Sequence, residues 1–118
     1  MKKILVIDDE IDAVEMLKKR LEYNQYQVIG ACDGVEGIKM AKRELPDLIL
    51  LDICMPVMDG YSFVQEYQKI EEIKHIPLLI CTAKAELKDI FKLEGFPYLL
   101  KPLRVEELIG KINELLAE

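Results

Sequence analysis

The stretch LILLDICMPVMDG, residues 48–60, places a carboxylate directly after four aliphatic residues. The aliphatic run, Leu48–Leu51, is typical of a strand that is buried on both faces of a parallel sheet. Asp52 follows this run, and Pro56 and Gly60 interrupt the pattern after it. An ionised carboxylate beside an apolar core is costly to desolvate unless another group compensates its charge. The stretch therefore predicts a buried strand that ends at a polar site.

The composition is that of an ordinary globular domain with an excess of acidic residues. The chain has 118 residues, of which 51% are hydrophobic, and a net charge of -6. This length fits one domain, which we expect to span residues 1–118. An acidic chain lacks the basic face that unaided nucleic-acid binding requires. The apolar run after Met1 is too short for a signal-peptide core, and no run approaches the roughly 20 residues of a membrane span. We therefore expect a cytoplasmic protein that binds neither nucleic acid nor membranes directly.

Three cysteines, Cys32, Cys54 and Cys81, are present, and none is spaced as CxxC. An odd number without that spacing indicates reduced thiols in a cytosolic protein, not a disulfide framework or a zinc site. Cys32 and Cys81 end short apolar runs, so both are expected to be small buried side chains.

Short apolar runs alternate with helical patterns along the whole chain. The runs are Ile4–Ile7, Val28–Ala31, Leu48–Leu51, Leu78–Cys81 and Tyr98–Leu100. The apolar stripes with a spacing of three or four residues span Ile11–Leu21, Val35–Leu45, Phe63–Ile70, Leu87–Phe91 and Val105–Leu116. Five strands alternating with five helices predict βαβ units, hence an α/β fold with a parallel sheet covered on both faces. The second run is the weakest and fits an edge strand.

Polar residues follow four of the five predicted strands. Asp8 and Asp9 come after the first, Asp52 after the third, Thr82 after the fourth and Lys101 after the fifth. In an open parallel α/β sheet, ligands bind beyond the carboxyl ends of the strands. If the first and third strands are neighbours, about 4.8 Å apart, their three carboxylates converge on one small volume.

Three carboxylates in one pocket repel one another, and each raises the pKa of the others. A Mg²⁺ ion would relieve this repulsion, because it prefers oxygen ligands and binds through one or two carboxylates together with phosphate oxygens. Lys101 and Thr82 would suit the remaining phosphoryl oxygens. An aspartate can itself act as a nucleophile and form an aspartyl phosphate. The pattern predicts that Asp52 is such an acceptor, compensated by a metal ion and by Lys101.

The whole chain resembles the receiver domain of bacterial two-component response regulators. The motifs that carry the resemblance are ILVIDDE at 4–10, PDLILLDICMPVMDG at 46–60, CTA at 81–83 and YLLKP at 98–102. Their order and spacing are more specific than any one of them. The resemblance implies a flavodoxin-like, doubly wound sheet of five parallel strands in the order 2-1-3-4-5, with five helices.

The resemblance also implies roles for individual residues. A histidine kinase or a histidine phosphotransfer protein would donate the phosphoryl group to Asp52. Asp9 would bind Mg²⁺ directly, Asp8 would act through a metal-bound water, and the backbone carbonyl of Cys54 would complete the protein ligands. Lys101 would pair with the phosphoryl group.

The signal would leave the site through a switch pair. By resemblance, Thr82 is the switch hydroxyl, Tyr98 is the switch aromatic, and the Lys101–Pro102 bond is cis. The face made by the fourth helix, the fifth strand and the fifth helix would bind a downstream protein or a second copy. Such a domain catalyses only its own phosphorylation and dephosphorylation and is not an enzyme for an external substrate.

Two features depart from the family pattern. The segment from Thr82 to Lys101 is a few residues short, so we expect the fourth helix to be short or irregular. Gly37 falls in the middle of the second predicted helix, where glycine costs about 1 kcal/mol of helix propensity.

Other functions remain open at this point. A phosphohydrolase with an aspartate nucleophile needs a second acid two residues after Asp52, and Cys54 at that position argues against one. A flavin site needs a first loop that cradles phosphate, which Asp8, Asp9 and Glu10 would repel. A non-phosphorylated adaptor of the same fold would not need these carboxylates together with Lys101. Taken alone, the acidic run would only favour a helix N-terminus.

Overall fold

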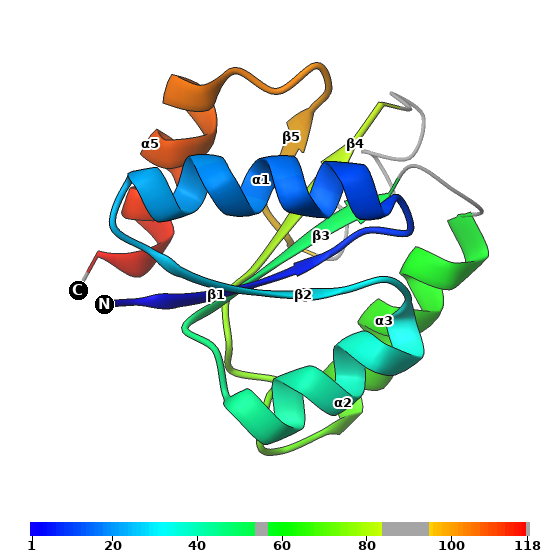
Figure 1. Cartoon of the computed structure of the whole chain (residues 1–118). Helices are drawn as coiled ribbons and strands as arrows, with labels where there is room; N and C mark the ends of the chain where they lie inside the picture. The colour runs from blue at the N-terminus through cyan, green and yellow to red at the C-terminus, as the bar shows by residue number, and fades with distance from the viewer. Residues whose placement is uncertain (54–56, 84–94, 118) are drawn as a thin grey trace.

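The computed structural model describes residues 1–53, 57–83 and 95–117, and in it strands and helices alternate along the chain (Figure 1). The strands are β1 (Lys3–Ile7), β2 (Gln27–Ala31), β3 (Leu48–Ile53), β4 (Leu78–Thr82) and β5 (Tyr98–Leu100). The helices are α1 (Ile11–Tyr23), α2 (Gly34–Glu44), α3 (Val57–Lys69) and α5 (Val105–Leu116). The fourth predicted helix, with its stripe at Leu87–Phe91, lies outside the described residues, so four of the five expected helices are seen.

All five strands are parallel and form one sheet in the order β2-β1-β3-β4-β5. This order confirms the predicted fold, with the weakest strand, β2, at one edge. Helices α1 and α5 cover one face of the sheet, and α2 and α3 cover the other (Figure 1). Within the described segments, every helix is too short or too polar to cross a membrane.

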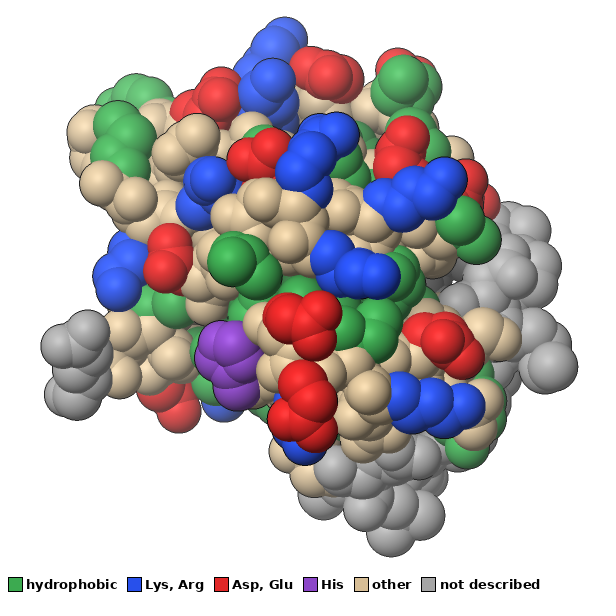
Figure 2. Space-filling model, turned by 90° about the horizontal axis from the view of Figure 1, so that it is seen from below, with side chains coloured by type: hydrophobic (Ala, Val, Ile, Leu, Met, Phe, Trp, Pro, Cys, Tyr) green, Lys and Arg blue, Asp and Glu red, His purple; other side chains and the backbone are tan. Residues whose placement is uncertain are grey.

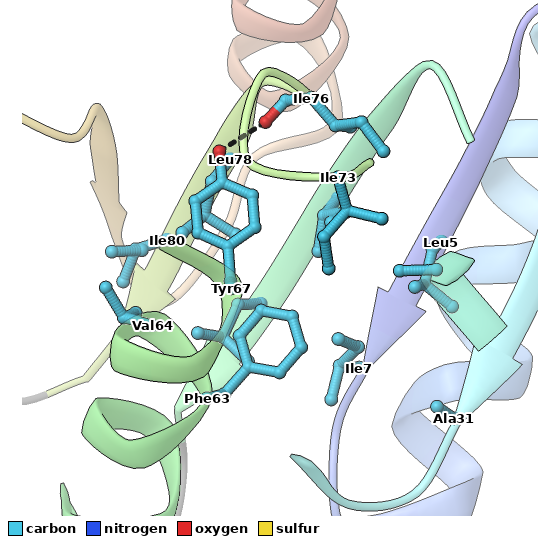
Figure 3. Packing of buried hydrophobic residues seen from close by; sticks show 13 residues of the cluster. Leu5, Ile7, Ala31, Phe63, Val64, Tyr67, Ile73, Ile76, Leu78 and Ile80 are labelled. Atoms are coloured by element: carbon cyan, nitrogen blue, oxygen red, sulfur yellow. Dashed lines mark hydrogen bonds between the residues drawn. The ribbon is translucent and has the colours of Figure 1, made fainter. Parts of the chain in front are cut away.

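One hydrophobic cluster lies between the sheet and helices α2 and α3 (Figure 3). Helix α3 contributes Phe63, Val64 and Tyr67, which follow the predicted stripe. The rings of Phe63 and Tyr67 stack with centroids 6.2 Å apart. The hydroxyl group of Tyr67 donates a hydrogen bond to the carbonyl oxygen of Ile76 (Figure 3). This bond satisfies the polar end of a buried ring and fixes the loop before β4.

A second hydrophobic cluster lies between the sheet and helices α1 and α5. It contains Val14, Leu17 and Leu21 from α1, and Leu108 and Ile112 from α5. These residues belong to the first and fifth predicted stripes. The sheet is therefore buried on both faces, as its continuous aliphatic strands require.

The burial that the stripes predicted for Ile11, Val35 and Leu45 was wrong. Ile11 and Val35 are exposed, because each lies in the first turn of its helix, beyond the covered part of the sheet. Leu45 is exposed because it caps α2 with a left-handed φ of 46° and so leaves the helix. Cys32, expected to be buried, is also exposed, because β2 ends at Ala31 and Cys32 follows it.

Gly37 allows α2 to pack closely against β1. A Cβ atom at Gly37 would lie 2.6 Å from Cδ1 of Ile7, which is closer than atoms can pack without movement. The same applies where α1 crosses β2, because a Cβ at Gly30 would lie 2.7 Å from Cγ1 of Val14. The loss of helix propensity at Gly37 is therefore the cost of a close helix–strand contact.

We expect two of the helix glycines, Gly37 and Gly110, to respond oppositely to alanine. At Gly110 an added Cβ meets no neighbouring atom within 4 Å. Gly110→Ala should therefore raise the free energy of unfolding by up to about 1 kcal/mol. Gly37→Ala should lower it, because overpacking costs about 1–3 kcal/mol and exceeds the gain in propensity. Urea denaturation of both variants measures the difference.

The steric origin of the effect is tested with Ile7→Val, which removes the Cδ1 atom that a Cβ at Gly37 would meet. The double variant should be more stable than the sum of the two single effects predicts. A stability gain in Gly37→Ala alone, equal to that in Gly110→Ala, would show that the contact at Ile7 imposes no constraint.

Candidate functional site

Asp8 lies between the end of β1 and the start of α1. Its backbone N–H donates to the carbonyl oxygen of Ala31 at 3.1 Å, which continues the pairing of β1 with β2. Its Oδ1 atom accepts a hydrogen bond of 2.9 Å from the backbone N–H of Glu10. The carboxylate is buried. Asp8 thus satisfies a backbone donor at the start of α1 and also brings a negative charge to the carboxyl edge of the sheet.

Asp52 lies within β3, and only 2% of its side chain is exposed. The Nζ atom of Lys101 is 2.5 Å from Oδ1 of Asp52. The backbone N–H of Lys101 donates to the carbonyl oxygen of Thr82 at 2.9 Å, which ties the lysine to the end of β4. The Lys101–Pro102 peptide bond is cis, as the resemblance implied. The structure therefore brings Asp8, Asp52 and Lys101 together, as predicted.

Burial raises the pKa of Asp52 to about 7. This value also includes the hydrogen bond with Asp8, which raises the pKa because a protonated Asp52 can donate to the Asp8 carboxylate, and the contact with Lys101, which lowers it. Asp8 and Asp52 thus form a pair of buried carboxylates, and the Lys101 ammonium group is in direct contact with Asp52. This excess of negative charge favours a further cation at the site.

The remaining predicted site residues lie at the same edge or outside the described residues. Asp9 follows β1 and is exposed. Thr82 ends β4 and is fully buried. Tyr98 begins β5, opposite Ile80 of β4, and is partly buried against the cluster beneath α2 and α3. Cys54, whose carbonyl was the last predicted metal ligand, lies outside the described residues.

In residues 1–53, 57–83 and 95–117, no group of three His, Cys, Asp or Glu side chains is placed to hold a metal ion. The carboxylates of Asp8 and Asp52, which interact directly, are the pair that the structure does bring together. Their oxygen atoms fit a hard divalent cation, which binds through one or two carboxylates and takes its other ligands from water or phosphate.

A cavity of about 250 Å³ opens between α1 and α5 and has Asp52 and Lys101 in its wall. Helix α1 contributes Met16, Leu17 and Arg20 to its lining. The sequence analysis missed this cavity because Met16 and Arg20 lie outside the apolar stripe of α1. No periodic signal marks such a site, since it depends on how far apart two helices sit on the sheet.

Comparisons with known proteins point to one protein family over nearly the whole chain. The family model described as response regulator receiver domain matches residues 4–113. The chain is 36% identical to Protein PilH of Pseudomonas aeruginosa, over 99% of both chains. It is 36% identical to the DNA-binding dual master transcriptional regulator RpaA of Synechocystis sp., over 98% of this chain and 49% of that protein. The chain thus spans about half the length of RpaA and of similar transcriptional regulators among its curated relatives.

Solved structures agree with this result. The chemotaxis protein CheY4 of Vibrio cholerae aligns with a TM-score of 0.86 and 32% identity, covering 98% of both chains. A CheY-like receiver domain protein from Methanospirillum hungatei aligns with a TM-score of 0.85 and 29% identity, covering 98% of this chain and 94% of that one.

The raised pKa of Asp52 predicts a pH dependence of stability. The ordinary value is 3.8 and the value in the fold is about 7. Asp52 therefore contributes stability below about pH 4, and this contribution is lost as the pH rises through about 7. In EDTA, the free energy of unfolding of the wild type should fall relative to that of Asp52→Asn between about pH 4 and pH 8, by at least about 1 kcal/mol.

Urea denaturation at a series of pH values measures this difference. The control is Asp12→Asn, at an exposed position on α1, which leaves the Asp52 carboxylate in place. Parallel pH profiles for Asp52→Asn and the wild type would mean that the Asp52 carboxylate is not destabilised by its surroundings.

Proposed function

The chain belongs to the response regulator receiver domain family, and on this premise we propose that residues 1–118 form a phosphoacceptor switch whose acceptor is Asp52. The observation that carries the proposal is the buried Asp52 carboxylate, held 2.5 Å from the Lys101 ammonium group at the carboxyl edge of the sheet. Domains of this family are signalling switches and not dedicated enzymes.

Phosphoryl transfer would begin with Asp52 ionised. One of its carboxylate oxygens forms a bond to phosphorus while the bond between phosphorus and the donor's histidine nitrogen breaks. That nitrogen keeps the electron pair and takes up a proton from solvent. Lys101 favours the ionised form of Asp52 before transfer, and after transfer its ammonium group can pair with a phosphoryl oxygen.

We propose that the site takes Mg²⁺. Asp8, Asp9, Asp52 and the backbone carbonyl of Cys54 would hold the ion. When bound, it supplies positive charge that neutralises the phosphoryl oxygens. The support from the structure is the direct interaction of two buried carboxylates, one of which, Asp52, has a pKa raised to about 7 by burial first and by Asp8 second. A second cation beside them removes this repulsion, so its binding is coupled to ionisation of Asp52.

The phosphodonor would be a histidine kinase or a histidine phosphotransfer protein that docks on α1. Met16 and Tyr23 of α1 are 56% and 85% exposed, which is unusual for large apolar side chains. Met16 also lines the cavity whose wall contains Asp52 and Lys101. A partner that covers this face of α1 would therefore bury apolar area and place its histidine near the acceptor.

The output would pass through Thr82 and Tyr98 to a surface that includes β5 and α5, where a downstream protein or a second copy binds. Direct DNA binding is not part of the proposal, although the relative RpaA is named as DNA-binding. The chain carries a net charge of -6. On the face formed by α2 and α3, acidic and basic side chains are interspersed (Figure 2). We place the protein in the cytoplasm, where its phosphodonors act.

A phosphohydrolase remains the runner-up, because it would use the same Asp52 nucleophile. It requires a second acid two residues later, and the chain has Cys54 there. A non-phosphorylated adaptor of this fold would have no use for an ion pair between Asp52 and Lys101.

We expect acetyl phosphate with Mg²⁺ to modify Asp52 alone. The wild type should gain the mass of one phosphoryl group, located by peptide mapping after reduction with borohydride. Asp52→Asn should gain none, while the exposed control Asp12→Asn should label like the wild type. Label on another residue, or label that persists in Asp52→Asn, would remove the basis of the proposed function.

We expect Mg²⁺ affinity to depend on Asp8 and Asp9 as well as on Asp52. Loss of one carboxylate ligand should weaken binding about tenfold or more, because few protein ligands hold this ion. NMR titration of Asp8→Asn and Asp9→Asn against the wild type measures the effect, with Asp12→Asn as the control. Equal affinities would show that the acidic pair serves only the start of α1.

A further inference from the structure

The cavity between α1 and α5 begins at the acceptor and extends along α1. The residues of α1 that line it share one face of the helix and are Ala13, Met16, Leu17 and Arg20. From Ala13 to Arg20 the helix axis advances by about 10 Å. Helix α1 starts shortly after Asp8, so Ala13 lies toward the carboxyl edge of the sheet, where Asp52 and Lys101 are. Arg20 lies toward the other end of the cavity.

The wall between these two ends is mostly apolar. Leu17 and Leu108 are buried, and Leu103 and Val105 are partly buried. Met16 is exposed and lies at the rim. The cavity volume is about 250 Å³, whereas an apolar cavity of about 150 Å³ is enough to hold benzene. The cavity therefore has room for a small molecule whose apolar part contains about six carbon atoms.

The charged groups of the wall have an excess of positive charge. They are Asp52, Lys101 and Arg20, and the carboxylate of Asp52 is already paired with Lys101. None of the salt bridges within residues 1–53, 57–83 and 95–117 includes Arg20. A guanidinium group binds a carboxylate well, because it can donate two parallel hydrogen bonds to it. The end of the cavity at Arg20 therefore favours an anionic group.

A second cavity adjoins the first at this end. Its volume is about 260 Å³, and it shares Arg20 and Val105 with the first cavity. It also contains Lys19, which is exposed and adds another positive charge. An anionic head beside Arg20 can thus remain in contact with water, while an apolar chain attached to it is covered by the wall of the first cavity.

We infer that this cavity binds a small aliphatic carboxylate, with its head on Arg20 and its chain directed toward Asp52 and Lys101. The opposite orientation would bring the head against the Asp52 carboxylate, which repels it. An apolar chain costs little at that end, because only 2% of the Asp52 side chain is exposed and it is already desolvated. The bound chain obstructs the approach of a phosphodonor and so inhibits phosphorylation. The inhibition rests on the proposed function, whereas the binding does not.

The length of the chain tests whether it is buried. Isotope-labelled protein is titrated with sodium butanoate and with sodium hexanoate, and the backbone NMR shifts are followed. Hexanoate should shift resonances of α1 and α5 and should bind about tenfold more tightly than butanoate, because two further CH₂ groups leave water. Equal affinities, or shifts confined to other elements, would overturn the inference.

The role of Arg20 is tested with a matched pair of variants. Arg20→Gln should weaken hexanoate binding by about three- to fivefold, as expected for an exposed ion pair. The control Lys42→Gln also removes a positive charge from the last turn of a helix, but on the other face of the sheet, and should bind like the wild type. The neutral analogue 1-hexanol should bind equally to the wild type and to Arg20→Gln. An equal loss of affinity for both compounds would show that Arg20 does not bind the carboxylate.

The effect on the acceptor is measured by phosphorylation. At about four times its Kd, hexanoate should slow the initial labelling of Asp52 by acetyl phosphate and Mg²⁺ by about fivefold, as mass action requires of a competing ligand. The same concentration should slow Arg20→Gln less. Butanoate at that concentration controls for ionic strength and for binding of Mg²⁺ by carboxylates.

The outcomes separate this inference from the function on which part of it rests. A wild type that acquires no phosphoryl group on Asp52 would overturn the proposed function and the inhibition, and the NMR titrations alone would then decide whether the cavity takes a carboxylate. A wild type that is phosphorylated equally fast with hexanoate bound would overturn the inference that the chain obstructs Asp52.

Discussion

The contact between Lys101 and Asp52 is the interaction on which the site depends. Asp52 is brought into the interior by an aliphatic strand, and Asp8 is buried beside it, so the fold accepts two adjacent negative charges. One ammonium group at 2.5 Å compensates only part of this charge, and the pKa of Asp52 remains at about 7. A further cation would stabilise the two ionised carboxylates, and under the proposed function a phosphoryl group would enter beside the Lys101 ammonium group.

The same residues also form hydrogen bonds in the local backbone, and these bonds hold the charged groups in place. Asp8 satisfies the backbone N–H of Glu10 at the start of α1, and the backbone N–H of Lys101 satisfies the carbonyl of Thr82 after β4. Replacing Asp8 would therefore change a turn as well as a charge, whereas the bond of Lys101 is a backbone bond that fixes where its side chain starts. Close packing around the sheet adds to this rigidity, because Gly37 allows α2 to lie directly against Ile7 at the end of β1. Groups fixed in this way need little reorganisation when charge moves during phosphoryl transfer.

Sequence reasoning could predict whatever follows from periodicity and order along the chain. The five apolar runs predict the strands, and the rule for ligands in parallel sheets predicts that Asp8, Asp52 and Lys101 lie at one edge. The strand order itself came from resemblance. The sequence could not show features that depend on distances between elements. Two examples are the exposure of Ile11, in the first turn of α1, and the cavity between α1 and α5. Gly37 is the clearest example. The sequence shows that glycine lowers helix propensity there, but only the structure shows that a larger residue would meet Ile7 of β1.

The arrangement of β4 links the chemistry of the site to its readout. Cys81 and Thr82 are consecutive, so alternation directs the first toward the face of α1 and α5 and the second toward the face that Tyr98 shares with Leu78 and Ile80. A change at Asp52 reaches β4 through its partner in register, Cys81, and reaches β5 through the bond from Lys101 to the Thr82 carbonyl. The end of one strand thus carries both the support for the lysine and the hydroxyl assigned to the switch. Under the proposed function, a movement of the Lys101 backbone would act on Thr82 through this bond. A partner that binds near β5 can shift the state of the site only through its different affinities for the two arrangements of this strand end.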